Sequence, residues 1–344
     1  MTPELGCISI SVVITNYNYG RFVGAAIDSA LALEHRPVQV IVVDDGSTDD
    51  SQQVIARYGS SVAVVRRVRG GQGAAMNAGW RAATGEVVFF LDADDMLLPD
   101  VAGRVTDTFI GRPDLSRVQF PLQVVDEAAQ PIGEGIPPRR KRLFDGDPRH
   151  ALLRYPDDIV WQPTSGNAFA KRALDAVLPM PEEPYRICAD YYLLNMTALH
   201  GDVAALDRAG AQYRVHGRNG HFATRISAER LRSDIARTMI THDELQREAR
   251  LVNLTETITP AEDVRSVTSV ASRLISYRLD RAKHPIDNDR RISLLVLGLR
   301  SAKDRSDCTW WRRLVFAGWF SVATVAPRSL IRYVARPFVH LAPG

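Results

Sequence analysis

The sequence predicts an α/β protein with a mostly parallel central sheet, because apolar runs that end in polar clusters alternate with helical patterns. Residues 8–14, 38–43 and 89–91 are short runs rich in β-branched or aromatic side chains, which is typical of buried strands. Ligands of parallel sheets bind outside the carboxyl ends of the strands. We therefore expect the polar clusters after the three runs to lie in one crevice.

The segments between the strands read as turns and helices in the same order. The first strand leads into the polar segment 15–20 and then into a helical pattern with one apolar face. The second strand leads into the acidic segment 44–49, in which Ser47 or Thr48 can cap a helix. A glycine-rich entrance at 70–73 opens an alanine-rich helix, whose small side chains allow close packing on the sheet.

The third apolar run ends in three carboxylates, Asp92, Asp94 and Asp95. Crowded carboxylates repel one another unless a cation or a donor-rich ligand neutralises them. Magnesium and manganese take oxygen ligands and keep positions open for phosphate oxygens. The run therefore predicts a nucleotide-diphosphate site that holds Mn²⁺ or Mg²⁺, and the alternative is a solvated polar turn.

Four motifs occur in a fixed order, at residues 12–18, 42–49, 77–79 and 91–95. Their order and spacing, over roughly the first two-thirds of the chain, resemble the inverting family 2 glycosyltransferases of the GT-A fold. The resemblance implies a Rossmann-like nucleotide-diphospho-sugar transferase fold for residues 1–220. Because the pattern changes to helices from about residue 221, we expect residues 221–344 to form a helical C-terminal region. It also implies a nucleotide-diphosphate sugar as donor and Mn²⁺ or Mg²⁺ as cofactor.

The resemblance further assigns roles to single residues. Tyr17 would stack on the base, Thr15 would contact it through the backbone, and Asp44 or Asp45 would bind base or ribose. The metal or diphosphate ligands would be Asp94, Asp92 and His216, with Asp94 first among the aspartates. The expected donor-binding residues are Thr15, Tyr17, Asp44, Asp45, Asn77, Gly79, Asp92, Ala93 and Arg214. Taken alone, Tyr17 reads as a partly buried ring and His216 as a hydrogen-bonded surface residue.

Two later segments resemble the acceptor side of the family's site. Residues 164–172 match the acceptor-side segment and provide Gly166, Asn167 and Phe169, although an ordinary turn before a helix is an equal reading. Residues 188–194 match the segment that supplies the catalytic base, which makes Asp190 the candidate base. The alternative role of Asp190 is a helix N-cap. Many relatives carry Glu before this Asp, whereas this chain has Ala189.

Composition limits the class of protein. The chain has 344 residues, 45% of them hydrophobic, which is enough for a large core and an appended region. A formal net charge of +3 argues against nucleic acid as the main partner. The three cysteines lack metal-ligand spacing, and the first residues lack a signal-peptide pattern. We therefore expect a cytoplasmic location, including the inner face of the cytoplasmic membrane.

The last third of the sequence reads as helices. Residues 259–262 have capping-box form and open a helical pattern that Pro285 stops, and residues 292–299 begin another helix. After Asp307 arginines and aromatic residues alternate without any acidic residue. Residues 314–326 are too few to span a bilayer. We expect residues 308–344 to contact a membrane surface, and packing onto the catalytic domain or a homo-oligomer contact are the alternatives.

The predicted function is transfer of one sugar, with inversion, from a nucleotide-diphosphate sugar to an acceptor hydroxyl. The acceptor would be a glycan or a lipid-linked glycan of a bacterial surface polysaccharide or glycolipid pathway. One alternative is a sugar-1-phosphate nucleotidyltransferase, although residues 15–20 lack its basic glycine-rich signature. Another is a non-catalytic nucleotide-sugar-binding module, for which Ala189 is the single hint.

Overall fold

The computed structural model describes residues 8–138, 141–154, 159, 161–217, 227–254, 266–304 and 309–338. The chain divides into two compact units. Unit 1 comprises Met1–Arg149 and Val160–Arg218, and unit 2 comprises His150–Ile159 and Asn219–Gly344. The short segment 150–159 thus belongs to unit 2, although it lies within the first 220 residues of the chain. The sequence-based division at residue 220 does not include this segment in the second part.

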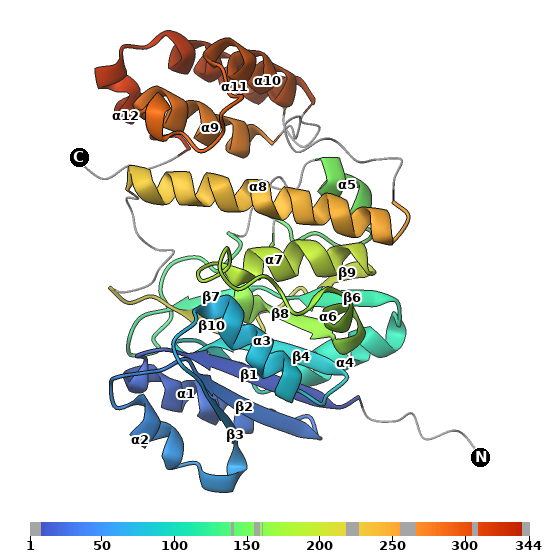
Figure 1. Cartoon of the computed structure of the whole chain (residues 1–344). Coiled ribbons are helices and arrows are strands. Elements are labelled where there is room, and N and C mark those ends of the chain that lie inside the picture. Colours follow the sequence, from blue (N-terminus) through green and yellow to red (C-terminus); the bar gives the residue numbers. More distant parts are fainter. Residues whose placement is uncertain are drawn as a thin grey trace. The chain divides into compact units, whose positions relative to one another are not determined.

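The central sheet of unit 1 has seven strands in the order β3-β2-β1-β4-β8-β6-β9 (Figure 1). All neighbouring strands pair in parallel except β8, which is antiparallel to both β4 and β6. The predicted α/β class with a mostly parallel sheet is therefore confirmed. The strands are β1 (Ile10–Asn16), β2 (Val38–Asp44), β3 (Ala63–Arg66), β4 (Val87–Asp92), β6 (Leu115–Gln119), β8 (Asn167–Ala170) and β9 (Asp202–Ala205).

The register of the three inner strands brings their carboxyl ends together. Thr15 of β1 lies beside Val43 of β2 on one side and beside Asp92 of β4 on the other. Asn16, the last residue of β1, pairs with Asp44, the last residue of β2. The polar residues that follow these strands therefore start from one edge of the sheet.

Helices cover both faces of this sheet. Val12 and Ile14 of β1 belong to a core with Val23 of α1, whereas Val13 points to the opposite face and contacts α3. A Cβ atom on Gly79 would lie 2.1 Å from Val13 Cγ1, so the absence of a side chain allows this close packing. The helices of unit 1 are α1 (Gly20–Leu31), α2 (Ser51–Ala56), α3 (Gln72–Ala82), α4 (Val101–Gly111), α6 (Lys171–Val177) and α7 (Ala189–Met196), with short 3₁₀ turns η1 (Gly59–Ser61), η3 (Thr164–Gly166) and η4 (Thr197–Leu199).

A second, three-stranded sheet has the order β5-β10-β7. Its strands are β5 (Met96–Leu97), β7 (Leu122–Val125) and β10 (Ala211–Arg214). Because β5 follows the acidic turn after β4, its pairing with β10 places the late residues of unit 1 beside that turn.

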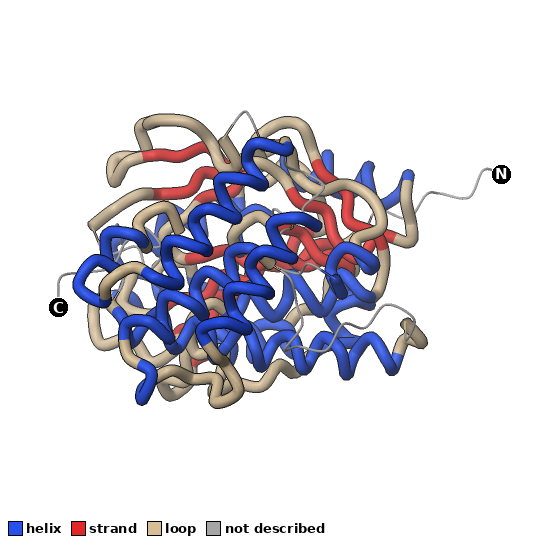
Figure 2. Tube along the Cα trace, turned by 90° about the horizontal axis from the view of Figure 1, so that it is seen from above, coloured by secondary structure: helices blue, strands red, loops and turns tan. Residues whose placement is uncertain are grey.

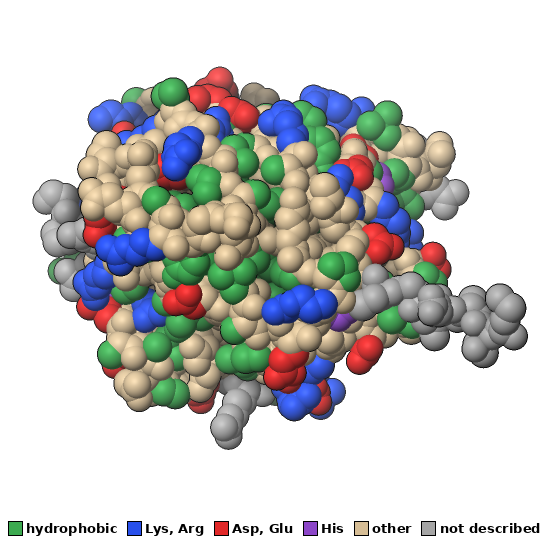
Figure 3. Space-filling view, turned by 90° about the horizontal axis from the view of Figure 1, so that it is seen from below, with side chains coloured by type: hydrophobic (Ala, Val, Ile, Leu, Met, Phe, Trp, Pro, Cys, Tyr) green, Lys and Arg blue, Asp and Glu red, His purple; other side chains and the backbone are tan. Residues whose placement is uncertain are grey.

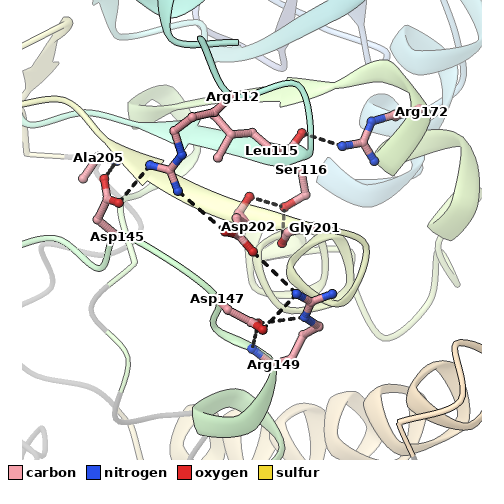
Figure 4. A network of polar contacts seen from close by, with 10 residues as sticks. All are labelled: Arg112, Leu115, Ser116, Asp145, Asp147, Arg149, Arg172, Gly201, Asp202 and Ala205. Carbon is pink, nitrogen blue, oxygen red and sulfur yellow. Dashed lines mark hydrogen bonds and ion pairs between the residues drawn. The ribbon is translucent and has the colours of Figure 1, made fainter. Parts of the chain in front are cut away.

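Ion pairs fasten the segment before α5 (Arg149–Arg154) to the edge strand β9 (Figure 4). Arg112 Nη1 donates to Asp145 Oδ1 at 2.9 Å, and its Nη2 lies 3.7 Å from Asp202 Oδ2. Arg149 Nε donates to Asp147 Oδ1 at 2.7 Å, and its Nη2 lies 3.5 Å from Asp202 Oδ1. Asp202 thus forms ion pairs with two arginines that are far apart in the sequence.

Unit 2 is helical, and its described residues contain no strand (Figure 2). Residues 259–262, the predicted helix start, lie outside the described residues, but the apolar face that follows them is buried in α9, including Ala271 and Leu274. Among the described residues no helix combines the length and the apolar character that crossing a bilayer requires. The helices are α8 (Ala228–Leu251), α9 (Val267–Leu279), α10 (Arg291–Asp304), α11 (Trp310–Val325) and α12 (Ile331–Val334), with 3₁₀ turns η7 (Arg281–Lys283) and η8 (Arg328–Leu330).

Candidate active site

Asp94 and His216, which are 122 positions apart, meet at the carboxyl edge of the sheet. His216 Nε2 lies 2.9 Å from Asp94 Oδ2, and the histidine side chain is 3% exposed. The imidazole stacks on Phe22 at a centroid distance of 4.9 Å and meets the edge of Tyr19 at 5.6 Å. Phe22 of α1 and Tyr19, which precedes this helix, therefore hold the ring in place for the contact with Asp94.

Arg214, at the end of β10, supports the same acidic turn. Its backbone N–H donates to Asp95 Oδ1 at 3.0 Å, and its Nε donates to the carbonyl of Asp94 at 2.9 Å. Its Nη1 donates to the carbonyl of Glu127 at 2.6 Å. Arg214 was predicted to bind the nucleotide sugar, but it uses several of its N–H groups for hydrogen bonds within the protein. These bonds fix the backbone of the acidic turn.

Negative charge accumulates in this turn. Burial, followed by the charges of Asp94 and Asp190, raises the pKa of Asp92 to about 8. Burial and the same kind of repulsion from Asp94 and Asp92 raise the pKa of Asp95 well above its ordinary value. Asp95 Oδ2 is buried without a hydrogen-bond partner in the described structure. The site is therefore suited to a positively charged ligand or ion.

Asp190 lies in the first turn of α7, close enough for its charge to act on Asp92. Its Oδ1 accepts from the backbone N–H of Tyr191 at 2.9 Å. The preceding N-cap, Cys188, has a left-handed backbone with φ of 61°, which is a strained conformation for a residue with a Cβ. The start of α7 is thus held in a constrained position beside the end of β4.

Gln72 is a site residue that the sequence did not single out. Its Oε1 accepts from the backbone N–H of Ala189 at 3.0 Å, and its Nε2 lies 3.5 Å from Asp92 Oδ1. One amide side chain therefore links the candidate base helix to the end of β4. Its position in the glycine-rich entrance at 70–73 is the only signal in the sequence that marks it.

Asp45 shapes that glycine-rich entrance. Its Oδ1 accepts from the N–H of Gly70 at 2.9 Å, and its Oδ2 accepts from the N–H of Gly71 at 2.7 Å. Arg67 Nε lies 3.3 Å from Asp45 Oδ1. Gly71 has φ of 94°, and a Cβ atom there would lie 2.7 Å from the backbone of Arg186, so both conformation and space require glycine.

Asp44 is also bonded within the protein. Its Oδ1 accepts from Asn16 Nδ2 at 3.1 Å, and its Oδ2 accepts from Gln52 Nε2 at 3.3 Å. The carboxylate is nearly buried. Asp44 and Asp45 therefore hold the strand ends and the glycine loop together at the place where base or ribose contacts were expected.

A pocket of about 640 Å³ opens between the end of β1 and His216. Tyr17, Phe22 and Glu127 are among the residues that line it. The guanidinium carbon of Arg69 lies 4.2 Å from the centroid of the Tyr17 ring. Thr15 is partly exposed at the end of β1. The structure thus brings Thr15, Tyr17, Asp92, Asp94, Asp190 and His216 to one side of the sheet.

Other predicted donor residues are used for packing. Asn77 exchanges two hydrogen bonds of 2.9 Å with the backbone of Met180, one as donor and one as acceptor. Gly79 packs against Val13, and Ala93 is 2% exposed. These three residues hold the framework of the site, and their surfaces face protein atoms.

The acceptor-side segment reaches the site through a residue that was not predicted. Ser165 Oγ accepts from the backbone N–H of Asp92 at 3.1 Å. Of the predicted residues, Asn167 is fully buried and donates to the carbonyl of Pro163 at 2.7 Å. Phe169 is 2% exposed and meets the ring of Phe90 at 6.0 Å, so it belongs to the core. A Cβ atom added to Gly166 would lie 2.8 Å from the Cβ atom of Gln162, so glycine at this position allows Gln162 to pack closely.

The oxygen and nitrogen atoms of Asp92, Asp94 and His216 are chemically suited to bind a hard divalent cation. In the described part of the chain, no group of three or more His, Cys, Asp or Glu side chains is preassembled for a metal. Asp94 and His216 instead contact each other directly. Carboxylate oxygens and an imidazole are nevertheless ligands that manganese accepts. Burial first, and then repulsion from Asp94 and Asp190, raises the pKa of Asp92, and a cation would favour its charged form.

Comparison with known proteins agrees with this architecture. Residues 11–150 match the family described as Glycosyl transferase family 2. The chain is 36% identical over 220 residues to an uncharacterized glycosyltransferase of Nostoc sp., which covers 63% of this chain and 67% of the relative. It is 30% identical over 240 residues to the succinoglycan biosynthesis protein ExoO of Rhizobium meliloti, which covers 66% of each.

A solved structure has the same fold over nearly the whole chain. The crystal structure of residues 1–349 of S. aureus TarS superposes with a TM-score of 0.58 and 15% identity, and the match covers 96% of this chain and 91% of that chain. TarS has also been crystallised in complex with UDP-GlcNAc. At this identity the likeness shows a shared fold.

Proposed function

Because the chain belongs to glycosyl transferase family 2, we propose that it moves one sugar, with inversion, from a nucleotide-diphosphate sugar to an acceptor hydroxyl. One observation carries the proposal. Asp92, Asp94 and His216 converge at the carboxyl edge of the sheet, and Asp190 lies close enough to raise the pKa of Asp92. Family membership also removes the alternative of a sugar-1-phosphate nucleotidyltransferase.

The donor would bind between Tyr17 and the acidic turn. The pocket that joins Tyr17 to His216 supports this placement. The ring of Tyr17 offers a surface for a base, with Arg69 close to one of its faces. The complex of TarS with UDP-GlcNAc, a protein of the same fold, supports a nucleotide sugar as the donor class.

Asp190 would act as the general base. Its carboxylate takes the proton from the acceptor hydroxyl while the acceptor oxygen attacks the anomeric carbon. The bond from that carbon to the diphosphate breaks on the opposite side, and its electron pair leaves with the nucleotide. A single carboxylate is enough, since the departing diphosphate needs no proton. Gln72 would keep α7 and Asp92 in register during this step.

Asp92, Asp94 and His216 are the residues that would hold Mn²⁺ or Mg²⁺. Such an ion, when bound, supplies positive charge that stabilises the leaving diphosphate. Arg214 would contribute by fixing the backbone of Asp94 and Asp95 through the hydrogen bonds described above. Phe22 would keep the His216 ring oriented toward the acidic turn.

The acceptor would be a glycan or lipid-linked glycan in the assembly of a bacterial surface polysaccharide or glycolipid. The name of the ExoO relative, a succinoglycan biosynthesis protein, supports this class. Ser165, which is buried and accepts from the backbone N–H of Asp92, would hold the end of β4 in place beside the acceptor.

The proposal is tested by the variant Asp190→Asn, once a screen of nucleotide sugars by thermal shift with manganese has identified the donor. We expect turnover to fall by about 10²–10⁴-fold, because the general base is lost, while the donor dissociation constant stays within a few fold. Asp107→Asn, an exposed carboxylate on α4, is the matched control. Turnover of Asp190→Asn equal to that of the control would refute the role, and a product with retained anomeric configuration would refute inversion.

A further inference from the structure

Helix α11 in unit 2 has apolar side chains on two opposite faces. Its inner face packs into the core of the unit through Phe320 and Ala323, both fully buried. Its outer face is exposed to solvent in the described structure. The exposed fractions are 51% for Trp311, 62% for Leu314, 58% for Val315, 53% for Val322 and 77% for Val325.

The exposed residues form a continuous stripe. Positions 311, 315, 318, 322 and 325 are separated alternately by four and three residues, which places them on one side of a helix. Position 318 is a glycine with nothing within 4 Å of an added Cβ, so the stripe is not interrupted by a packed neighbour there. A contiguous apolar face of this kind on a solvent-exposed surface is typical of an interaction site.

Basic and aromatic side chains occur on α11 and in the segment of α12, which Trp319 of α11 contacts by donating to the carbonyl of Val334 at 2.7 Å. Arg312, Arg332 and Arg336 are exposed, and no acidic residue follows Asp307 in the sequence. The guanidinium carbon of Arg312 lies 5.6 Å from the Trp311 ring, and that of Arg336 lies 4.9 Å from the Tyr333 ring. Arginines and amphipathic aromatic rings around an apolar face match the headgroup region of an anionic bilayer.

A second copy of the chain fits this face less well. A two-fold symmetric contact brings the same patch of both copies together. The arginines of one copy would then face those of the other without acidic partners from the same segment, which costs free energy. We therefore propose that the outer face of α11, together with α12, docks on the surface of an anionic lipid bilayer. This inference does not depend on the proposed transfer reaction.

The first test measures binding of the full-length chain to vesicles of phosphatidylcholine with and without phosphatidylglycerol. The variant carries Val315→Asp and Val322→Asp, two exposed positions of the stripe. We expect its partition onto anionic vesicles to fall by more than about tenfold, since the apolar contact is lost and negative charge is added. Leu251→Asp, at a residue of α8 that is 71% exposed, should bind as the unchanged chain does. Circular dichroism verifies that all three proteins are folded.

The second test addresses the charge. Arg312→Gln and Arg336→Gln should each lower binding to anionic vesicles about fivefold at low salt, and added salt should reduce the difference. Equal binding of the double aspartate variant and the Leu251→Asp control would overturn the proposal. So would equal binding to neutral and anionic vesicles, or a dimer in sedimentation that the double variant dissociates while lipid binding is absent.

Discussion

The acidic side chains after β4 are held together although their charges repel one another. Asp92 has a pKa raised to about 8, and Asp95 has a buried oxygen without a partner in the described structure. A fold selected for stability alone would not bury carboxylates in this way, because desolvation and repulsion both penalise the charged form. Perturbed groups of this kind gather at functional sites. A bound cation would therefore relieve the repulsion between the carboxylates of this turn.

Gln72 provides a prediction at this scale. Gln72→Ala removes both the contact with Asp92 and the acceptor for the Ala189 N–H. We expect turnover to fall by about tenfold or more, because Asp92 is a proposed metal ligand and partners of metal ligands typically contribute that much. The melting temperature should change little, since the side chain is partly exposed. Steady-state kinetics of Gln72→Ala should be compared with those of Gln53→Ala, a control at an exposed glutamine on α2. Equal turnover of the two variants would show that Gln72 does not support the site.

The candidate site could be predicted from the sequence only where residue type alone carries the chemistry. The residues Asp92, Asp94, Asp190 and His216 are titratable and sit in motifs, and the structure brings them to one edge of the sheet. Asn77 also sits in a motif, but its partner Met180 lies 103 positions away, and no local pattern shows that pairing. Roles that depend on distant backbone partners are therefore invisible before the fold is known.

Asp289 in unit 2 gives a prediction about pH. Burial alone would raise the pKa of Asp289, but hydrogen bonds from His284 and Arg273 and their charges lower it below its ordinary value. Because the folded pKa lies below the unfolded one, the stabilisation is complete above about pH 4 and is lost as the pH falls through the folded value. Asp289→Asn leaves the buried Arg273 without its partner, and we expect a loss of about 3–5 kcal/mol at neutral pH.

Urea denaturation at several pH values measures this effect. The difference between the unchanged protein and Asp289→Asn should shrink as the pH falls below about 4. Glu244→Gln breaks the pair with Arg247, which is 67% exposed, and should change the free energy of unfolding by less than about 1 kcal/mol. If Asp289→Asn and Glu244→Gln lowered the free energy of unfolding equally at neutral pH, the buried Arg273–Asp289 pair would contribute no more than an exposed one.

At the scale of elements, the predicted strands and helices follow the periodicity of the sequence, and the exceptions have physical causes. The runs 8–14, 38–43 and 89–91 correspond to β1, β2 and β4. The antiparallel strand β8 has four residues and follows a 3₁₀ turn, so the segment 164–172 reads equally well as a turn before a helix. Its strand pairing comes from β4 and β6, which supply hydrogen bonds that the segment itself does not encode.

The close packing of α3 on the sheet leads to a paired prediction. Gly79→Ala would place a Cβ 2.1 Å from Val13 Cγ1, and we expect a loss of about 1–3 kcal/mol from overpacking. Gly103→Ala in α4 meets nothing within 4 Å and should stabilise the protein by about 0.4–1 kcal/mol, because alanine restricts the unfolded chain. Chemical denaturation of the two variants checks both signs, and equal effects would show that α3 can move away from β1.

At the scale of the whole molecule, charge is distributed differently in different parts of the chain. Acidic and basic side chains are interspersed on the face shown in Figure 3. The segment from residue 309 to 338 carries arginines and no acidic residue. The net charge of +3 therefore conceals a local basic surface, and local patterning is a better guide to partners than the total.

The two units also have separate cores, and this leads to a prediction about unfolding. The core of unit 1 includes Val12 and Val23, whereas that of unit 2 includes Leu274 and Phe320. A ligand that binds only folded unit 1 stabilises that unit by about 2.7 kcal/mol at 100 times its dissociation constant. For a unit of this size, the melting temperature should rise by about 5–10 °C. Scanning calorimetry with donor and manganese should thus shift one transition and leave the other in place.

Asp289→Asn supplies the complementary perturbation in the same experiment. Because the Arg273–Asp289 pair is buried in unit 2, the variant should lower the transition that the donor leaves unchanged. Opposite responses of two transitions would show that each core melts by itself, since a cooperative unit responds to every perturbation as a whole. A single transition whose temperature changes with both the donor and the variant would instead show that the two units, including α11 in unit 2, unfold together.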